Sequence, residues 1–190
     1  NVYPYIWYSV DKFGSTMLIS GDYGIVAKST DGGAVWSSNN IQYNTQIMND
    51  VFNIPNSGKI WYVGRPSQLG QQVLYTSNNG NNWTPYGTGG TEEFFGIHMI
   101  NSNTGYVSAN NSKVFKTTNG GHNWIQKTNA SGTNYSLYSM EFINESTGWV
   151  FVNYSTVASG NVFKTTDGAE TWTQYNLAAA SPGGIMSADF

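Results

Sequence analysis

Cysteine is absent from this chain of 190 residues, so neither a disulfide framework nor thiolate chemistry is available to it. Arginine is almost absent: Arg65 is the only one, and the seven lysines are scattered. With a net charge of −3, the chain has no basic cluster that could neutralise phosphates, and this argues against nucleic acid as a partner. No apolar run approaches the roughly 20 residues that span a bilayer, so we expect no direct membrane insertion.

Charged residues of both signs are scarce, at 10% of the chain against about 25% in ordinary soluble domains. Polar surface must therefore come from Asn, Ser, Thr, Gln and Gly, a composition that favours short strands and turns over helices. Aromatic residues make up 15% of the chain and are suited to filling the space between packed sheets. The same composition favours an extracytoplasmic protein, whether secreted, periplasmic or at the cell surface.

One eight-residue phrase occurs four times, with the pattern Ser/Thr-x-Asp/Asn-x-Gly/Ala-x-x-Trp. Its closing tryptophans are 47, 41 and 48 residues apart, a spacing typical of repeated supersecondary units. The four copies end at Trp36, Trp83, Trp124 and Trp172.

A longer unit surrounds each phrase. In the fourth unit, four runs of strand-forming residues (137–143, 149–152, 161–165 and 171–175) are separated by turn residues. Such a unit is a four-stranded antiparallel meander, and one meander alone cannot bury both of its faces. We therefore predict an all-β fold, a β-propeller with four-stranded antiparallel blades at about 6–38, 46–86, 93–127 and 135–175. A stacked solenoid is the alternative.

The segment 184–190 resembles the first strand of a unit. We therefore expect residues 1–190 to form a single propeller region with four blades and the first strand of a fifth, as part of a longer chain. A closed four-bladed ring, with 184–190 placed elsewhere, is the alternative.

The repeated phrase has the residue types of a pinned turn. Its Asp or Asn can accept hydrogen bonds from backbone N–H groups further along the turn, and Gly allows a positive φ. The tryptophan buries a large apolar surface at the start of the last strand. Catalysis or metal binding is the alternative role for these side chains, which are Asp31, Asn78, Asn119 and Asp167. His98 and His122 are too isolated to indicate a metal cluster, and no cofactor is expected.

The phrase is the Asp-box, or bacterial neuraminidase repeat. The longer pattern Asn-x-x-Thr-Gly-Tyr/Trp-Val, followed by Val-Phe-Lys-Thr-Thr-Asp/Asn-Gly and Trp, resembles the repeats of the photosystem II assembly and stability factor family and its non-photosynthetic bacterial relatives. It is also similar to the repeats of xyloglucanases and of sortilin-type receptors. The resemblance implies a propeller with its boxes at the blade peripheries, away from any active site.

Enzymatic roles are not favoured. A sialidase holds its substrate carboxylate with three arginines, which Arg65 alone cannot supply. A polysaccharide hydrolase needs two carboxylates across a cleft, and no sequence context marks such a pair. We predict a non-catalytic binding or scaffolding propeller that acts through loops and blade faces on a protein or glycan partner. A xyloglucanase-like glycoside hydrolase and an assembly factor for a membrane protein complex are the alternatives.

The mouth of the propeller channel is the best candidate ligand site. Four polar residues recur at nearly the same place in the first strand of successive units, and they would line this channel: Asp50, His98, Glu141 and Asp189. An ordinary wet channel wall is the alternative explanation.

Two further features suggest contacts. Tyr62, Tyr106 and Trp149 each begin a second strand, which predicts packing between blades rather than a platform for stacking sugars. The longest loops, at 65–72, 87–93 and 128–135, are expected to carry the variable contact surfaces.

Overall fold

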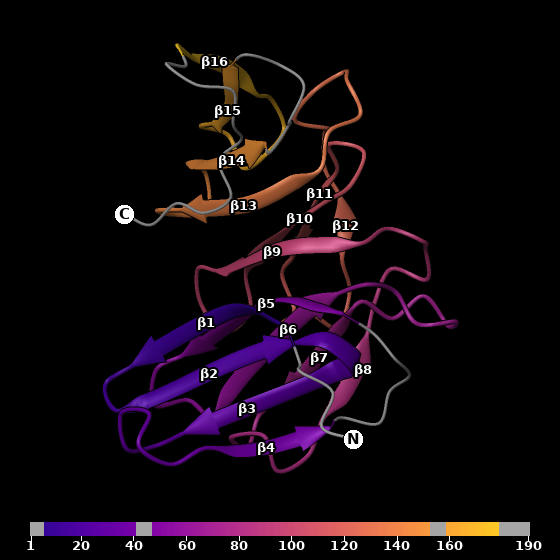
Figure 1. Cartoon of the computed structure of the whole chain (residues 1–190). Coiled ribbons are helices and arrows are strands. Elements are labelled where there is room, and N and C mark those ends of the chain that lie inside the picture. The colour runs from indigo at the N-terminus through magenta and orange to yellow at the C-terminus, as the bar shows by residue number, and fades with distance from the viewer. Residues whose placement is uncertain (1–5, 41–46, 153–158, 179–190) are drawn as a thin grey trace. The chain divides into compact units, whose positions relative to one another are not determined.

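The computed structural model describes residues 6–40, 47–152 and 159–178 of the chain. The predicted strand 184–190, and with it Asp189, lies outside these residues. The described part is all-β apart from one 3-10 turn, and its strands form four separate four-stranded antiparallel sheets. In each sheet the strands lie side by side in chain order, as Figure 1 shows. The fold is a β-propeller, and each sheet is one blade.

We name the sheets A to D in chain order. Sheet A contains β1 (Trp7–Phe13), β2 (Thr16–Gly21), β3 (Ile25–Ser29) and β4 (Ser37–Asn40), with the 3-10 turn η1 (Asp22–Gly24) after β2. Sheet B contains β5 (Met48–Ile54), β6 (Lys59–Gly64), β7 (Val73–Thr76) and β8 (Thr84–Tyr86). Sheet C contains β9 (Phe94–Met99), β10 (Gly105–Ala109), β11 (Val114–Thr117) and β12 (Ile125–Gln126). Sheet D contains β13 (Leu137–Phe142), β14 (Gly148–Val152), β15 (Ser159–Thr165) and β16 (Thr173–Ala178).

The chain forms two compact units, Asn1–Glu92 with sheets A and B and Glu93–Phe190 with sheets C and D. The last strands of sheets A and D continue to Asn40 and Ala178, beyond the blade ends at 38 and 175 that the sequence predicts. No helix in the described ranges is long and apolar enough to cross a membrane.

Within each unit, one sheet packs its face against the next. In the first unit, Leu18 and Val26 of sheet A form a buried cluster with sheet B residues, among them Tyr62. In the second unit, Tyr106 and Val114 of sheet C do the same with residues of sheet D. The tryptophan of the second sheet's box packs against each cluster, Trp83 in one unit and Trp172 in the other. The box tryptophan therefore faces the preceding blade.

Every first strand carries a β-bulge near its beginning. The register shifts between Trp7 and Ser9 in β1 and between Met48 and Asp50 in β5. Equivalent shifts occur where β9 pairs with β10 and between Leu137 and Ser139 in β13. A bulge increases the local twist and puts an extra side chain on one face. The bulges therefore decide which first-strand side chains share a face.

The four box turns are closed by the same hydrogen bonds. In the first, the Ser29 hydroxyl donates to Asp31 Oδ1 at 2.7 Å, the Gly33 N–H donates to the Ser29 hydroxyl, and the Val35 N–H donates to Asp31 Oδ1. In the second and third turns, Asn78 and Asn119 accept the equivalent bonds through their amide oxygens. Asn and Asp are thus interchangeable here because the turn needs an acceptor oxygen rather than a charge.

The fourth turn departs from the others at Ala169. This residue has φ 69°, in the left-handed region where the equivalent residues of the other turns are glycines. Ala169 is fully buried in the core of the second unit. Packing of its methyl group offsets the backbone strain of a non-glycine residue in this conformation, which is of order 1 kcal/mol.

A pH titration tests the fourth turn. The hydroxyl and the N–H of Thr171 both donate to Asp167, and these bonds lower the pKa of its carboxyl to about 2. A depressed pKa in the folded state means that the stabilisation is complete above the ordinary value of 3.8 and is lost as the pH falls through about 2. We expect the Thr171 amide resonance to titrate with a midpoint near 2, and Asp167→Asn to abolish this titration.

The third turn is the internal control, because Asn119 holds the Asn123 N–H without a titrating group. A midpoint near 4 for Thr171 would contradict the assignment.

A glycine substitution tests the packing beside the bulge of sheet B. A Cβ atom at Gly64 would lie 1.9 Å from the backbone carbonyl oxygen of Ile47, which also accepts the Arg65 N–H. We expect Gly64→Ala to lower the free energy of unfolding by about 1–3 kcal/mol, as overpacking does, measured by urea denaturation. Gly132→Ala is the control, because nothing lies within 4 Å of its Cβ position, and the two variants should not have equal stabilities.

Candidate functional site

The first strands of sheets A and B are joined by polar contacts. The Ser9 hydroxyl donates to Asp50 Oδ1 at 2.5 Å, and the Val51 N–H donates to the same oxygen at 2.8 Å. Two residues further along β1, Asp11 Oδ2 accepts hydrogen bonds from the backbone N–H and from the side-chain amide of Asn53, at 2.7 and 2.9 Å. Both carboxylates therefore hold β1 against β5.

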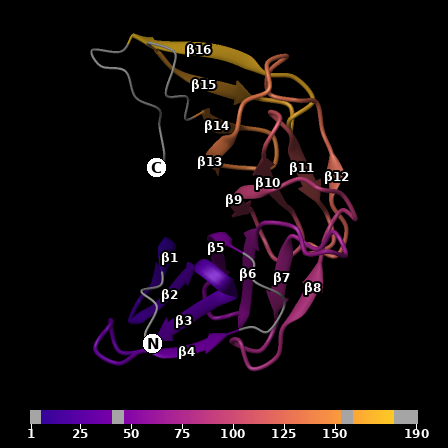
Figure 2. The ribbon, with the colours of Figure 1, turned by 45° about the vertical axis from the view of Figure 1, so that its right-hand side comes forward.

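The second unit has an equivalent seam between β9 and β13, which lie next to each other in Figures 1 and 2. His98 Nδ1 lies 3.3 Å from Glu141 Oε2, and the exposed fractions of the two side chains are 16% and 19%. The rings of Phe95 and Tyr138 are stacked, with centroids 4.7 Å apart. Tyr138 is 37% exposed, so part of this aromatic surface faces solvent. We call Phe95, His98, Tyr138 and Glu141 the first-strand patch.

The strand register refines the predicted row of channel residues. His98 and Glu141 hold the same position, opposite Tyr106 and Trp149. In sheet A this position belongs to Asp11, opposite Leu18. Asp50 lies two residues earlier, directly after the bulge and opposite Val63. Three of these residues therefore share one register position, and Asp50 alone lies two residues before it.

Sequence reasoning missed Asp11 and Ser9, because the first unit is the most degenerate copy. Counting back from the Ser29 box to the second-strand Leu18 would have found Asp11, since the three strands are in register there. Of the predicted set, the structure brings His98 and Glu141 together, while Asp50 pairs with Ser9. Asp189 is outside the described residues.

The chemistry of this row is that of fixed polar contacts. Each of its carboxylates has a donor from the neighbouring first strand. Within the described ranges, no three His, Cys, Asp or Glu side chains are grouped so that they could hold a metal ion.

The equivalence expected among Tyr62, Tyr106 and Trp149 is wrong by one residue in sheet B. Trp61 is the true counterpart, because it pairs with Tyr75 just as Tyr106 pairs with Lys116. The count fails because strand β6 reads Ile-Trp-Tyr-Val, with two adjacent aromatics, where β10 and β14 have a single aromatic residue before the valine. Tyr62 therefore points to the opposite face from Trp61 and enters the interface with sheet A.

The two long loops of the first unit, at 65–72 and 87–93, are tied together by Gln72, which is 1% exposed. Its side-chain amide donates to the Thr88 hydroxyl and to the Gly90 carbonyl, and its carbonyl accepts the Thr88 N–H at 3.0 Å. Leu69 is 78% exposed at the tip of the first loop. These loops thus present a fixed surface.

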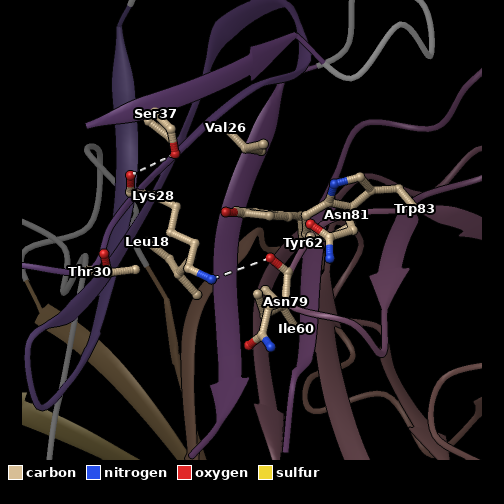
Figure 3. Close-up of a pocket in the computed structure, with 12 residues that line it drawn as sticks. Leu18, Val26, Lys28, Thr30, Ser37, Ile60, Tyr62, Asn79, Asn81 and Trp83 are labelled. Atoms are coloured by element: carbon tan, nitrogen blue, oxygen red, sulfur yellow. Dashed lines mark hydrogen bonds between the residues drawn. The ribbon is translucent and has the colours of Figure 1, made fainter. Parts of the chain in front are cut away.

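A hollow of about 260 Å³ lies between sheets A and B, beside the box of sheet B (Figure 3). Leu18, Val26 and Ile60 form its apolar wall. Lys28 crosses its edge, where its ammonium group donates to the Asn79 carbonyl at 3.3 Å. Tyr62 extends from β6 into the hollow, next to Trp83, whose ring centroid is 5.1 Å away. We call this the A/B hollow.

Known structures share this fold. The chain is similar to a structure described as YCF48 bound to D1 peptide, with 17% identity over 90% of this chain and 66% of that one, at a TM-score of 0.55. It is also similar to YCF48 from Cyanidioschyzon merolae, with 16% identity over 93% of this chain and 57% of that one, at a TM-score of 0.66. The chain thus spans about 57–66% of the length of these relatives.

A GH74 xyloglucanase from Xanthomonas campestris shares the fold as well, with 13% identity over 85% of this chain and 28% of that one, at a TM-score of 0.64. A comparison with curated protein sequences gives no match. A family model, described as photosynthesis system II assembly factor YCF48, matches residues 89–188, slightly more than half of the chain. The chain therefore belongs to the YCF48 family of photosynthesis system II assembly factors.

Proposed function

We propose that this chain is part of a non-catalytic propeller that binds a peptide segment of a protein partner. Membership of an assembly-factor family supports the proposal, as does the relative described as bound to D1 peptide. The same fold supports many activities, so the proposal depends on the surface of this chain.

The first-strand patch is the observation that carries the proposal. Stacked Phe95 and Tyr138 give a rigid, partly exposed aromatic surface. Beside it, the paired His98 and Glu141 offer a donor and acceptors. Aromatic groups next to hydrogen-bonding groups are the usual anchors of protein recognition. An extended peptide can lay an apolar side chain on the rings and hydrogen-bond to the pair.

Polysaccharide hydrolysis is the alternative that the xyloglucanase fold raises. An inverting or retaining hydrolase needs two carboxyl groups free to act on opposite sides of a bond. In this chain Asp11, Asp50 and Glu141 are each engaged by a side chain of the neighbouring first strand, which favours binding over catalysis.

Peptide display tests the proposal. We expect a library of random dodecapeptides to yield sequences that bind the chain, and Tyr138→Ala to weaken them about tenfold, or about 1.4 kcal/mol, through loss of the stacked surface. Fluorescence anisotropy with the selected peptides measures the affinities. Tyr175→Ala is the matched control, because Tyr175 is a similarly exposed tyrosine on the last strand of sheet D.

Two results would overturn the proposal. One is equal binding by wild type and a folded Tyr138→Ala variant. The other is a display experiment in which no peptide is enriched. Release of reducing sugar from xyloglucan would then favour the hydrolase alternative.

A further inference from the structure

The A/B hollow exists because two aromatic residues found in the other unit are replaced. Between sheets C and D, the ring of Tyr106 is stacked flat on Phe142, with centroids 3.8 Å apart and planes at 3°. In sheets A and B the register puts Leu18 and Asn53 at these positions. The space that two rings fill in the second unit is therefore only partly filled in the first.

The hollow also contains polar groups without partners. Tyr62 is 1% exposed, and its hydroxyl makes no hydrogen bond with any residue in the described part of the chain. The indole N–H of Trp83 is buried and likewise lacks an acceptor there. In the corresponding interface of the second unit, the tyrosine and the box tryptophan are both paired. Its tyrosine, Tyr106, comes from the other sheet and donates its hydroxyl to the Glu145 carbonyl at 2.7 Å. Its box tryptophan, Trp172, which is equivalent to Trp83, donates its indole N–H to the Thr128 carbonyl at 3.0 Å. The Tyr62 hydroxyl therefore faces the hollow as an unpaired donor, and an acceptor placed there would pair with it.

The lysine at the edge of the hollow indicates what kind of group fits. Lys28, Lys116 and Lys164 hold equivalent positions on the third strands. Lys116 lies 5.2 Å from the ring centroid of Tyr106, and Lys164 lies 5.2 Å from that of Trp149. The cross-strand neighbour of Lys28 is Leu18, so the ammonium group of Lys28 has no aromatic ring at the position where Lys116 and Lys164 have one. An aromatic ring placed in the hollow would restore the cation–π contact.

We propose that the A/B hollow is a binding site for a phenolic ring. The ring takes the place that the Tyr106 ring has in the second unit, between Lys28 and the apolar wall of Leu18, Val26 and Ile60. Its oxygen accepts a hydrogen bond from the Tyr62 hydroxyl.

The protonation state of Tyr62 suits this role. Burial raises the pKa of its phenol above the usual range, so the hydroxyl remains a donor at every pH at which the protein is used. The site is formed by sheets A and B, whereas the first-strand patch is formed by sheets C and D, so the two share no residue. It therefore goes beyond the proposed peptide-binding function and can be tested separately.

The probe is p-cresol, the side-chain analogue of tyrosine, and toluene is its matched control without the hydroxyl. The readout is the indole N–H resonance of Trp83, identified among the seven tryptophans by its loss in Trp83→Phe. For a ligand of this size we expect a dissociation constant on the order of 1 mM and a saturable shift. Toluene should bind at least about fivefold more weakly, because it leaves the Tyr62 hydroxyl unpaired.

Two variants locate the site. Leu18→Tyr copies the second unit and should fill the hollow, so that the p-cresol shift disappears while the melting temperature is unchanged or higher. Tyr62→Phe should weaken p-cresol about fivefold and make it equal to toluene. Tyr75→Phe is the control and should bind as wild type, because Tyr75 packs against Trp61 on the other face of sheet B.

N-acetyl-tyrosinamide separates the two sources of a phenolic ring. Binding of both this compound and p-cresol supports entry of a tyrosine side chain, and binding of p-cresol alone supports a small free phenol. The proposal is overturned if wild type shows no saturable Trp83 shift, or if p-cresol and toluene bind it equally. It is also overturned if p-cresol still shifts Trp83 in folded Leu18→Tyr, or binds Tyr62→Phe as it binds wild type. None of these results depends on Tyr138, so they leave the peptide-binding proposal standing.

Discussion

The rest of this structure depends on one constraint: a four-stranded meander has two apolar faces and can cover neither by itself. In each unit the box tryptophan of the second sheet packs against the buried cluster that this sheet forms with the first. The box turn makes this possible, because its Ser or Thr hydroxyl and its Asp or Asn acceptor fix the chain just before the tryptophan. The turn therefore serves the interface between sheets as much as the sheet that it belongs to.

The same constraint explains why equivalent positions can exchange large and small side chains. The interface between sheets C and D is filled by Tyr106, whereas that between A and B is filled from the other side by Tyr62, at a position where sheet D has Val150. Both arrangements bury an aromatic residue completely. They differ in where the hydroxyl ends, because Tyr106 reaches the Glu145 carbonyl and Tyr62 ends in the A/B hollow. Protein interiors are close-packed, so a large side chain that is lost from one sheet must be replaced by an equal volume from its neighbour. Where the replacement does not fill the same place, a hollow remains.

The first strands show how the repeat carries both structure and surface. Their bulges place polar and aromatic side chains where successive sheets meet, and each unit uses them differently. Sheets A and B are joined by Ser9 with Asp50 and by Asp11 with Asn53, while C and D are joined by a ring stack and a histidine–glutamate pair. A shared scaffold thus presents distinct chemistry along its first strands, which is how rigid sheets acquire specific surfaces.

The sequence by itself determined the blade architecture and the box turns, because both follow from local interactions. Four meanders separated by Gly and Asn turns can be read from the period of the tryptophans, and the Asp31 turn closes through residues within six positions of one another. Only the tertiary structure decided which side chains meet across sheets. In sheet B, Phe52 holds the register position of His98 and Glu141, and Asp50 lies two residues before it. The adjacent aromatics of β6 conceal that Trp61, not Tyr62, matches Tyr106. The A/B hollow depends on this offset, because one residue of register sends a side chain to the opposite face of its sheet. The contacts of Asp11 and of the first-strand patch join residues about 40 positions apart, which only the packing of one sheet on the next brings together.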